Sequence, residues 1–393
     1  MPLVSSTLAL LTLPGTLELL GLTVAGALPP RRRSAPTRTL RRLAVVIPAH
    51  NEESVVRSAV RSIMACESAP CPVSVFVIAD NCSDRTATAA GEAGAQVLVR
   101  NDPLLRGKGY ALEYAFRVIG ERHEDVDAFL VVDADTTVDA NFLRATHDAF
   151  ASGAAAVQCR YLIQNPEASP RVRLMGVAFM AFNVLRPRGR DRLGLSAGIL
   201  GNGFGLARET VKRVPYTARS VVEDLEYHLE LVRTGLRVEF VDETAVRAIQ
   251  PDGEQANQTQ RSRWEGGRFR MIREHVPQLL HEVVRGKPRL TEPLLELLLL
   301  PLGFHVGSLG VLLMIPFPPT QLYAAGALGV VAAHVATALR VGKASREDLV
   351  ALGKAPFYVA WKLRLLPQIF RASQRDQEWV RTERDREAPV ATA

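Results

Sequence analysis

The chain has 393 residues, of which 47% are hydrophobic and 23% are charged, and its formal net charge is +7. This length and apolar content fit one large or two ordinary domains and exclude a disordered protein. Much of the positive charge lies near the apolar segments, and no helix-turn-helix, zinc-finger or RNA-binding signature occurs. We therefore expect an anionic membrane surface, and no nucleic acid, as a partner.

Residues 4–28 form the first apolar run, which is long enough to cross a bilayer core that needs about 20 helical residues. Glu18 and Pro14 oppose insertion, but the many leucines outweigh the cost of one central charge. A cleaved signal peptide is the alternative, because residues 25–27 resemble a cleavage site, but no Lys or Arg precedes the run. We expect residues 1–29 to form a transmembrane anchor.

A basic linker, residues 30–42, follows the anchor and contains Arg31, Arg32, Arg33, Arg38, Arg41 and Arg42. The cytoplasmic flanks of membrane helices are the ones enriched in Lys and Arg. The linker therefore predicts that the next domain lies in the cytoplasm.

Four short β-rich runs come next, at residues 43–49, 73–80, 96–100 and 128–133, and segments of helical composition separate them. This alternation predicts an α/β domain over residues 43–290 with a mainly parallel central sheet covered on both faces. Ligands of such sheets bind beyond the carboxyl ends of the strands. The residues that end each run are therefore candidates for a site.

A proline and several polar residues stand at or just after the ends of three runs. The candidate site residues are Pro48, Asn51, Glu52, Asp80, Asp133 and Asp135. Capping of the following helix is an equally good explanation for Asn51. Capping does not explain a paired set such as Asp133 and Asp135, whose carboxylates are the hard ligands that suit Mg²⁺ or Mn²⁺ on a diphosphate. Lys108, in Arg-Gly-Lys-Gly before a predicted helix, is a cation suited to phosphate, although P-loop spacing is absent.

Apolar spacing after Val222 predicts a helix that begins at Glu223 and Asp224. Acidic residues are common in the first turn of a helix because they favour its dipole. Taken alone, the pair fits either that structural role or a catalytic carboxylate.

A second helix, predicted over residues 257–275, places Gln260 and Trp264 on one face by i, i+4 spacing, with Arg263 adjacent. Tryptophan offers an apolar platform for a sugar ring, and arginine can hold a phosphate with two hydrogen bonds. A basic face at the membrane is the alternative for the arginines of this helix.

Residues 294–315 and 320–340 are two further apolar runs, joined by a proline-rich turn. They predict a transmembrane helical hairpin over residues 291–341, with a buried pair of core helices as the alternative. Residues 342–393 are mixed in character, which indicates either a helix at the membrane interface or a soluble helix packed on the catalytic domain. We expect this C-terminal region to be cytoplasmic or interfacial.

Six motifs occur in an order that resembles the membrane-bound family 2 glycosyltransferases, the class with cellulose, chitin and hyaluronan synthases and ceramide glucosyltransferase. They are Pro-Ala-His-Asn-Glu, the Asp80 turn, Gly-Lys-Gly, Asp-x-Asp, Glu-Asp and Gln-x-x-Arg-Trp, within residues 43–275. The resemblance implies a GT-A fold with added transmembrane helices. It also implies an inverting, Mg²⁺- or Mn²⁺-dependent transferase that uses a nucleotide sugar.

For the donor, the resemblance implies that Asp80 contacts the nucleotide base and that Pro48, Asn51 and Glu52 line the nucleoside. Lys108 would lie near the diphosphate, Asp133 would approach the ribose and the metal, and Asp135 would bind the metal.

For the reaction, the resemblance implies that Asp224 is the general base and that Glu223 shapes the acceptor site. Gln260, Arg263 and Trp264 would hold the diphosphate and the acceptor end. The segment 201–203 resembles the family's acceptor loop. Val222 stands where the family often has threonine, which leaves the acceptor geometry open.

The expected function is transfer of a sugar, with a UDP-sugar as donor, to a glycan or a lipid-linked acceptor in cell-envelope polysaccharide or glycolipid synthesis at the plasma membrane. A processive synthase that exports its product with a partner is the alternative, since about three predicted spans are too few for a self-contained pore. Nucleotidyl transfer would leave the motif at Gln260 unexplained. A non-catalytic membrane scaffold conflicts with the intact Asp133, Asp135 and Asp224.

Overall fold

The computed structural model describes residues 2–220, 222–250 and 254–357, and their side chains except those of residues 254–265. Two compact units divide the chain. Of the described residues, we call 2–31, 169–197 and 265–357 the helical unit, and 32–168 and 198–264 the sheet unit. Each is described by itself.

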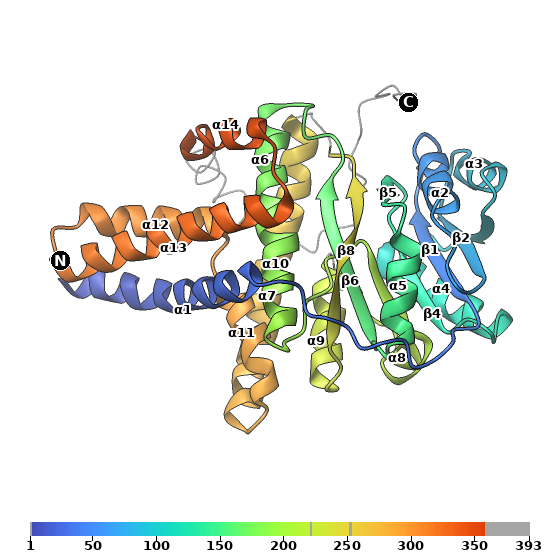
Figure 1. Cartoon of the computed structure of the whole chain (residues 1–393), viewed down its shortest axis with the longest axis horizontal. Helices are drawn as coiled ribbons and strands as arrows, with labels where there is room; N and C mark the ends of the chain where they lie inside the picture. Colours follow the sequence, from blue (N-terminus) through green and yellow to red (C-terminus); the bar gives the residue numbers. More distant parts are fainter. Residues whose placement is uncertain (1, 221, 251–253, 358–393) are drawn as a thin grey trace. The chain divides into compact units, whose positions relative to one another are not determined.

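The sheet unit contains strands β1 (Leu43–Ala49), β2 (Val73–Asp80), β3 (Gln96–Arg100), β4 (Ala128–Val131), β5 (Thr136–Val138), β6 (Ala156–Ile163), β7 (Phe204–Ala207) and β8 (Val238–Ala248). In the described residues they form one eight-stranded sheet in the order β3-β2-β1-β4-β7-β6-β8-β5 (Figure 1). The first three predicted runs match β1, β2 and β3 residue for residue, and the fourth ends earlier, at Val131.

The sheet is mixed. Strand β1 pairs in parallel with β2 and β4, β2 with β3, and β6 with β8, whereas β7 runs antiparallel to β4 and β6, and β5 antiparallel to β8. Since β3, β2, β1 and β4 are parallel neighbours, their carboxyl ends share one edge, which is where ligands bind in sheets of this kind. The expected parallel arrangement therefore holds for the half of the sheet that carries the donor-site candidates.

The helices of the sheet unit are α2 (Val56–Met64), α3 (Thr86–Glu92), α4 (Lys108–Arg122), α5 (Phe142–Ala151), α8 (Arg208–Arg213) and α9 (Glu223–Arg233). A buried apolar cluster joins β1 and β4 to Val60 and Ile63 of α2 and to Phe142 and Phe150 of α5. A strand covered on both sides has no solvent face, which explains why residues 43–47 of β1 are all apolar and fully buried.

The helical unit contains α1 (Pro2–Ala27), α6 (Pro170–Phe179), a π-helical turn (Met180–Leu185), α7 (Arg186–Arg192), a 3₁₀ turn (Pro288–Leu290), α11 (Thr291–Leu298), α12 (Leu302–Met314), α13 (Pro318–Gly342) and α14 (Arg346–Leu352). Helix α10 (Glu254–Val284) begins in the sheet unit and continues into the helical unit. Helices α1, α12 and α13 pack side by side (Figure 1).

Two described helices, α1 and α13, are long and apolar enough to cross a membrane, which agrees with the predicted anchor and with one arm of the predicted hairpin. The other arm is not one straight helix, because α11 and α12 meet at a bend of 71°. Pro301 lies at this break, where a proline lacks the N–H that a continuous helix needs. The 13 residues of α12 span about 20 Å, less than a bilayer core of about 30 Å.

A buried ionic network explains how α1 tolerates Glu18. Arg190, which is 2% exposed, lies 3.4 Å from a Glu18 oxygen and 3.2 Å from a Glu296 oxygen, and it also contacts Glu292. Arg186 is 3.4 Å from the same Glu18 oxygen. The negative charge of Glu18, which opposes insertion of α1 into a membrane, is therefore paired within the helical unit. These ion pairs join α1, α7 and α11.

The basic linker is mostly engaged in the sheet unit. Arg33 contacts Glu243 and donates to the Phe240 carbonyl, Arg41 pairs with Asp127, and Arg42 pairs with Asp125 at 2.6 Å. These contacts hold the segment before β1 in place. Only part of the arginine cluster is therefore available to contact lipid, because Arg33, Arg41 and Arg42 are paired with carboxylates. Arg31 and Arg32 are exposed.

Candidate functional site

The turns after β1 and β2 are tied together by Asn51. Its backbone has a positive φ of 55°, which asparagine adopts more readily than most residues, and its Oδ1 accepts a hydrogen bond of 2.7 Å from the Ser83 amide. The Glu52 amide donates to Thr86 Oγ1 at 2.7 Å. Helix α2 begins only at Val56, so the capping explanation for Asn51 is wrong. Pro48, in β1, is half-buried beside this turn.

Asp80 ends β2 and is 5% exposed. Burial raises the pKa of its carboxyl group, although Arg100 Nη1 at 2.6 Å and the Asn81 side-chain amide at 3.1 Å stabilise the charged form. Arg100 ends β3, the neighbouring strand, and sequence reasoning did not identify it. The position therefore offers a buried carboxylate whose direction is fixed by an arginine.

Lys108, the first residue of α4, links two segments of the site. Its Nζ donates to Asp133 Oδ1 and to the Gly201 carbonyl, each at 2.5 Å. Burial favours the neutral amine, but the charges of Asp133, Glu223 and Asp224 outweigh it and raise the pKa of Lys108. The ammonium group therefore stays charged at the point where these segments meet.

Glu223 and Asp224 begin α9, as the apolar spacing predicted. Both side chains are half-buried. This burial, together with the neighbouring Asp224 charge, raises the pKa of Glu223 to about 7. Burial also raises the pKa of Asp224, although the Leu225 amide donates to its Oδ1 at 2.9 Å. Two carboxylates with raised pKa values form a proton-accepting pair.

The segment 201–203 brings Asp224 into the site. Gly201 has a φ of 78°, and an added Cβ there would lie 3.0 Å from Asp224 Oδ2. Asn202 is fully buried, where its Oδ1 accepts from the Asp133 amide at 3.1 Å and its Nδ2 donates to Thr136 Oγ1 at 2.9 Å. The loop therefore orients Asp133, and the absence of a side chain at Gly201 lets its backbone pack directly against Asp224.

Gln158 of β6 holds this loop in place and was missed by sequence reasoning. It is fully buried, donates to the Asn202 carbonyl at 2.8 Å, and accepts from the Leu200 amide at 2.9 Å. The available signal was a lone glutamine in an otherwise apolar stretch of strand. A buried amide of this kind needs partners, and the loop backbone provides them.

Asp133 and Asp135 follow β4, as expected, and Thr136 Oγ1 donates to Asp135 Oδ1 at 3.1 Å. Among the described residues, no three His, Cys, Asp or Glu side chains converge to hold a metal ion by themselves. Mg²⁺ usually takes one or two carboxylates and completes its shell with water and substrate phosphates. The oxygen donors of this pair fit that pattern.

The loop before α9 packs closely on α4. An added Cβ at Gly109 would lie 2.2 Å from the Ala218 carbonyl oxygen, and Arg219 pairs with Glu113 at 2.5 Å. The ring centroid of Tyr110 lies 4.3 Å from the guanidinium carbon of Arg219 and 5.8 Å from that of Arg100. These contacts fix the loop that leads to Glu223.

Gly109→Ala is therefore expected to lower the turnover catalysed at this candidate site by about tenfold or more, because the loop backbone must move away from α4 and carry the start of α9 with it. The matched control is Gly120→Ala in the same helix, where an added Cβ meets nothing within 4 Å. Steady-state turnover of the two variants tests this, and equal rates would show that the packing at Gly109 does not position the carboxylates.

Gln260, Arg263 and Trp264 lie on α10, which begins at Glu254 and ends at Val284 and so extends beyond the predicted range at both ends. Their side chains lie outside the described part of the structure. Their roles at the diphosphate and acceptor remain predictions, as does any role for residues 358–393, which are also outside it.

The model of a protein family described as "Glycosyltransferase like family 2" matches residues 41–267. A curated relative, the probable glycosyltransferase YdaM of Bacillus subtilis (strain 168), is 23% identical over 253 residues, which cover 61% of this chain and 58% of that protein. The chain thus spans less than two thirds of the length of this relative. Protein RfbJ of Shigella flexneri is 32% identical over 99 residues, covering 25% of this chain and 68% of that protein.

A solved structure with a similar fold is the mannosyltransferase PcManGT from Pyrobaculum calidifontis, in complex with GDP-Man and Mn²⁺. The match has a TM-score of 0.56 at 16% identity and covers 95% of this chain and 99% of that one. At this identity the likeness concerns the fold. It extends over the helical unit as well as the sheet unit, and it agrees with the expected GT-A architecture.

Proposed function

Because the chain belongs to glycosyltransferase family 2, we propose that this glycosyltransferase is an inverting, metal-dependent enzyme that transfers a sugar from a nucleotide sugar to a glycan or lipid-linked acceptor. The observation that carries the proposal is the meeting of Lys108, Asp133 and the loop at Gly201 beside Asp224. Lys108, a cation that can hold a diphosphate, and Asp224, a carboxylate that can accept a proton, lie in the same site.

The donor half of the site is proposed to be the edge formed by β1, β2 and β4. Asp80, held by Arg100, faces the base, and the turn at Asn51 lines the nucleoside. Asp133 and Asp135 would hold a divalent ion, which neutralises charge on the departing diphosphate. Lys108 adds a second positive charge on the protein side, and it is already oriented by Asp133.

Asp224 is proposed to be the general base. It takes the proton of an acceptor hydroxyl while that oxygen forms a bond to the anomeric carbon. The bond from that carbon to the diphosphate oxygen breaks, and the nucleoside diphosphate leaves with the electron pair. A raised pKa suits this role, because a carboxylate accepts a proton better as its pKa approaches the working pH. Glu223 beside it would shape the acceptor site.

The donor base is tested by thermal unfolding with nucleotide sugars and Mn²⁺. We expect a UDP-sugar to raise the melting temperature of the wild type, since a ligand that binds only the folded state stabilises it. The GDP-sugar that PcManGT binds is the comparison. The Asp80→Asn variant should lose the shift, whereas Asp84→Asn, in the same turn, should keep most of it. Stabilisation by a GDP-sugar alone would contradict the UDP assignment.

Membrane association is supported by the apolar helices α1 and α13. We propose a multi-pass protein of the plasma membrane with the sheet unit in the cytoplasm, on the ground of the arginines that follow α1. In the part of the chain that the structure describes, two candidate spans, or three if the bent pair α11 and α12 counts as one, favour addition of a sugar to a lipid-linked acceptor over a self-contained export pore. A partner would be needed if a polymer were exported.

A further inference from the structure

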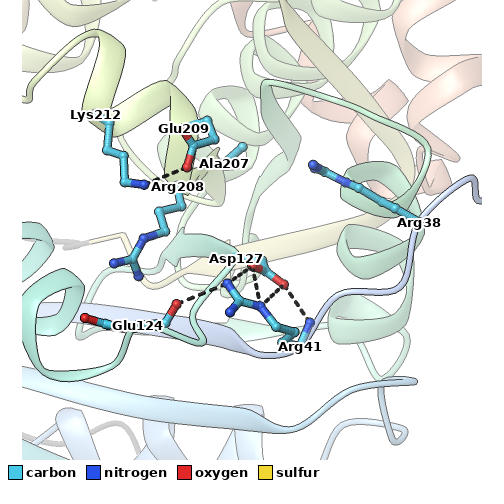
Figure 2. Close-up of a pocket in the computed structure, with 8 residues that line it drawn as sticks. All are labelled: Arg38, Arg41, Glu124, Asp127, Ala207, Arg208, Glu209 and Lys212. Carbon is cyan, nitrogen blue, oxygen red and sulfur yellow. Dashed lines mark hydrogen bonds and ion pairs between the residues drawn. The ribbon is translucent and has the colours of Figure 1, made fainter.

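A basic pocket lies in the sheet unit, at the edge of the sheet opposite the candidate active site. Its volume is about 350 Å³, and four cations line it: Arg38, Arg41, Arg208 and Lys212 (Figure 2). The first two precede β1, and Asp127, which also lines the pocket, directly precedes β4. The pocket therefore lies at the amino ends of parallel strands whose carboxyl ends carry the active-site carboxylates.

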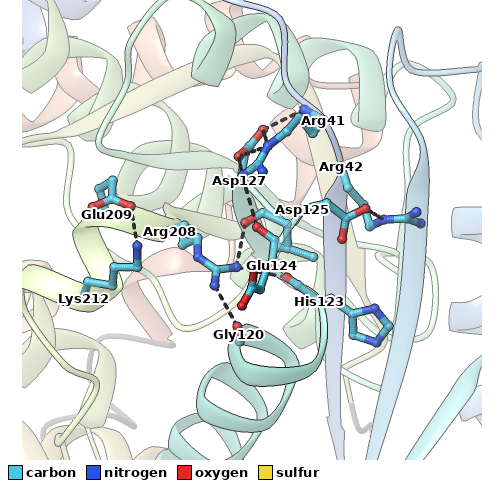
Figure 3. Close-up of polar contacts among 11 residues, drawn as sticks. Arg41, Arg42, Gly120, His123, Glu124, Asp125, Asp127, Arg208, Glu209 and Lys212 are labelled. Carbon is cyan, nitrogen blue, oxygen red and sulfur yellow. Dashed lines mark hydrogen bonds and ion pairs between the residues drawn. The ribbon is translucent and has the colours of Figure 1, made fainter.

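Two of the four guanidinium or ammonium groups are anchored by carbonyl oxygens at helix ends. Arg38 Nε donates to the Phe150 carbonyl, at the end of α5, at 2.8 Å. Arg208 donates to the carbonyls of Gly120 at 2.7 Å, His123 at 3.0 Å and Val126 at 3.2 Å, at and after the end of α4 (Figure 3). In the described part of the chain, neither group makes an ion pair with a carboxylate. Both guanidinium groups are therefore fixed in position by neutral acceptors.

Most of the other charged side chains that line the pocket form ion pairs with one another. Arg41 donates to Asp127 Oδ1 at 2.7 Å and to its Oδ2 through the backbone amide at 2.6 Å. Burial works against the charged form of Asp127, but these hydrogen bonds lower its pKa all the same. Lys212 pairs with Glu209 at 2.8 Å. The remaining carboxylate is Glu124, so the lining has one positive charge in excess (Figure 2).

We propose that this pocket binds a phosphate group, which Arg38 holds through hydrogen bonds, while Arg208, whose Nη1 and Nη2 already donate to three carbonyls, contributes mainly its positive charge. Arginine has five N–H donors in a planar fork that matches phosphate oxygens. Arg38 uses one of them in the hydrogen bond to Phe150, which leaves both terminal nitrogens for a ligand. The phosphate can belong to a free inorganic ion or to a lipid headgroup, and the chemistry of recognition is the same for both.

The test uses the full-length protein in detergent and follows thermal unfolding as inorganic phosphate is added. Arg38→Gln is expected to weaken phosphate binding about tenfold, because it removes a charged hydrogen-bond donor. Glu124→Gln is expected to strengthen binding, because it removes the unmatched negative charge. Arg117→Gln, an exposed arginine on α4 that pairs with Glu121, should bind phosphate as the wild type does. Equal affinities in all four proteins would overturn the proposal.

A catalytic-site variant separates this pocket from the diphosphate site. In Lys108→Met, phosphate should still stabilise the protein with the wild-type affinity, since Lys108 lies at the other edge of the sheet. If Lys108→Met loses the stabilisation while Arg38→Gln keeps it, the phosphate binds in the active site and the proposal is wrong.

Dioctanoyl phosphatidic acid and dioctanoyl phosphatidylcholine distinguish the two sources. Tighter binding of the phosphatidic acid than of inorganic phosphate, lost in Arg38→Gln, would identify a lipid headgroup as the ligand. Equal, Arg38-dependent affinities for phosphatidic acid and inorganic phosphate would identify the phosphate ion itself. If neither inorganic phosphate nor phosphatidic acid stabilised the protein, or if phosphatidylcholine stabilised it as much as phosphatidic acid, the proposed phosphate site would be wrong.

Discussion

Asp224→Asn is expected to lower sugar-transfer turnover by about 10²- to 10⁴-fold, the usual contribution of a positioned general base. Asparagine keeps the size of the side chain and the hydrogen bond from the Leu225 amide, but it cannot take the acceptor proton. Steady-state release of the nucleoside diphosphate measures the loss. The control is Glu230→Gln on the same helix, whose carboxylate is 45% exposed and pairs with Arg233, and it should retain wild-type turnover.

The same variant should be more stable than the wild type at pH 8. The folded state raises the pKa of Asp224 and of Glu223, the latter from 4.5 to about 7, so it favours the protonated forms. Ionisation of such groups costs stability, and the cost grows as the pH rises from the unfolded pKa to the folded pKa. The neutral asparagine side chain removes part of that cost, so the melting temperature should rise while turnover falls. A variant that is both inactive and less stable would indicate misfolding, and its loss of activity would not support Asp224 as the general base.

Arg190→Met is expected to destabilise the helical unit by about 3–5 kcal/mol, the usual effect of removing one partner from a buried ion pair. Arg190 is 2% exposed and faces three carboxylates, those of Glu18, Glu292 and Glu296. Methionine fills the space but leaves the negative charges facing one another. The loss appears as a lower temperature of half-inactivation in detergent.

Arg192→Met serves as the control for this substitution, because Arg192 lies two residues away in α7 and is exposed. It should change the half-inactivation temperature little, as surface substitutions generally do. If both variants lose the same stability, the ionic network does not hold α1, α7 and α11 together, and the decrease reflects the loss of any arginine from α7.

Strands β1, β2 and β3 and the start of β4 could be predicted because each run is short, apolar and bounded by polar turns, whereas β5, β6, β7 and β8 were not predicted. A strand covered on both sides must be apolar along its whole length, so the boundary of β1 or β2 is visible in the sequence. The rule that ligands lie beyond the carboxyl ends then pointed to Asp80 and Asp133. The Arg-Gly-Lys-Gly sequence before a helix pointed to Lys108, and the structure joins Lys108 to Asp133.

The partners that orient these residues could not be predicted, because they depend on contacts between distant parts of the chain. Arg100 meets Asp80 across two neighbouring strands, and Gln158 reaches the loop at Asn202 from β6. Arg190 meets Glu18 from 172 residues away in the sequence. In contrast, the break between α11 and α12 had a local signal in Pro301, which the length of the apolar run concealed.

The central claim, metal-dependent transfer from a nucleotide sugar, is tested most directly by nucleoside diphosphate release from a panel of nucleotide sugars, measured with Mn²⁺ and with EDTA, in the wild type and in Asp135→Asn. We predict release by the wild type from at least one sugar nucleotide only when the metal is present, and a large loss in Asp135→Asn. Release at the full rate in EDTA, or undiminished release in Asp135→Asn with Mn²⁺, would contradict it.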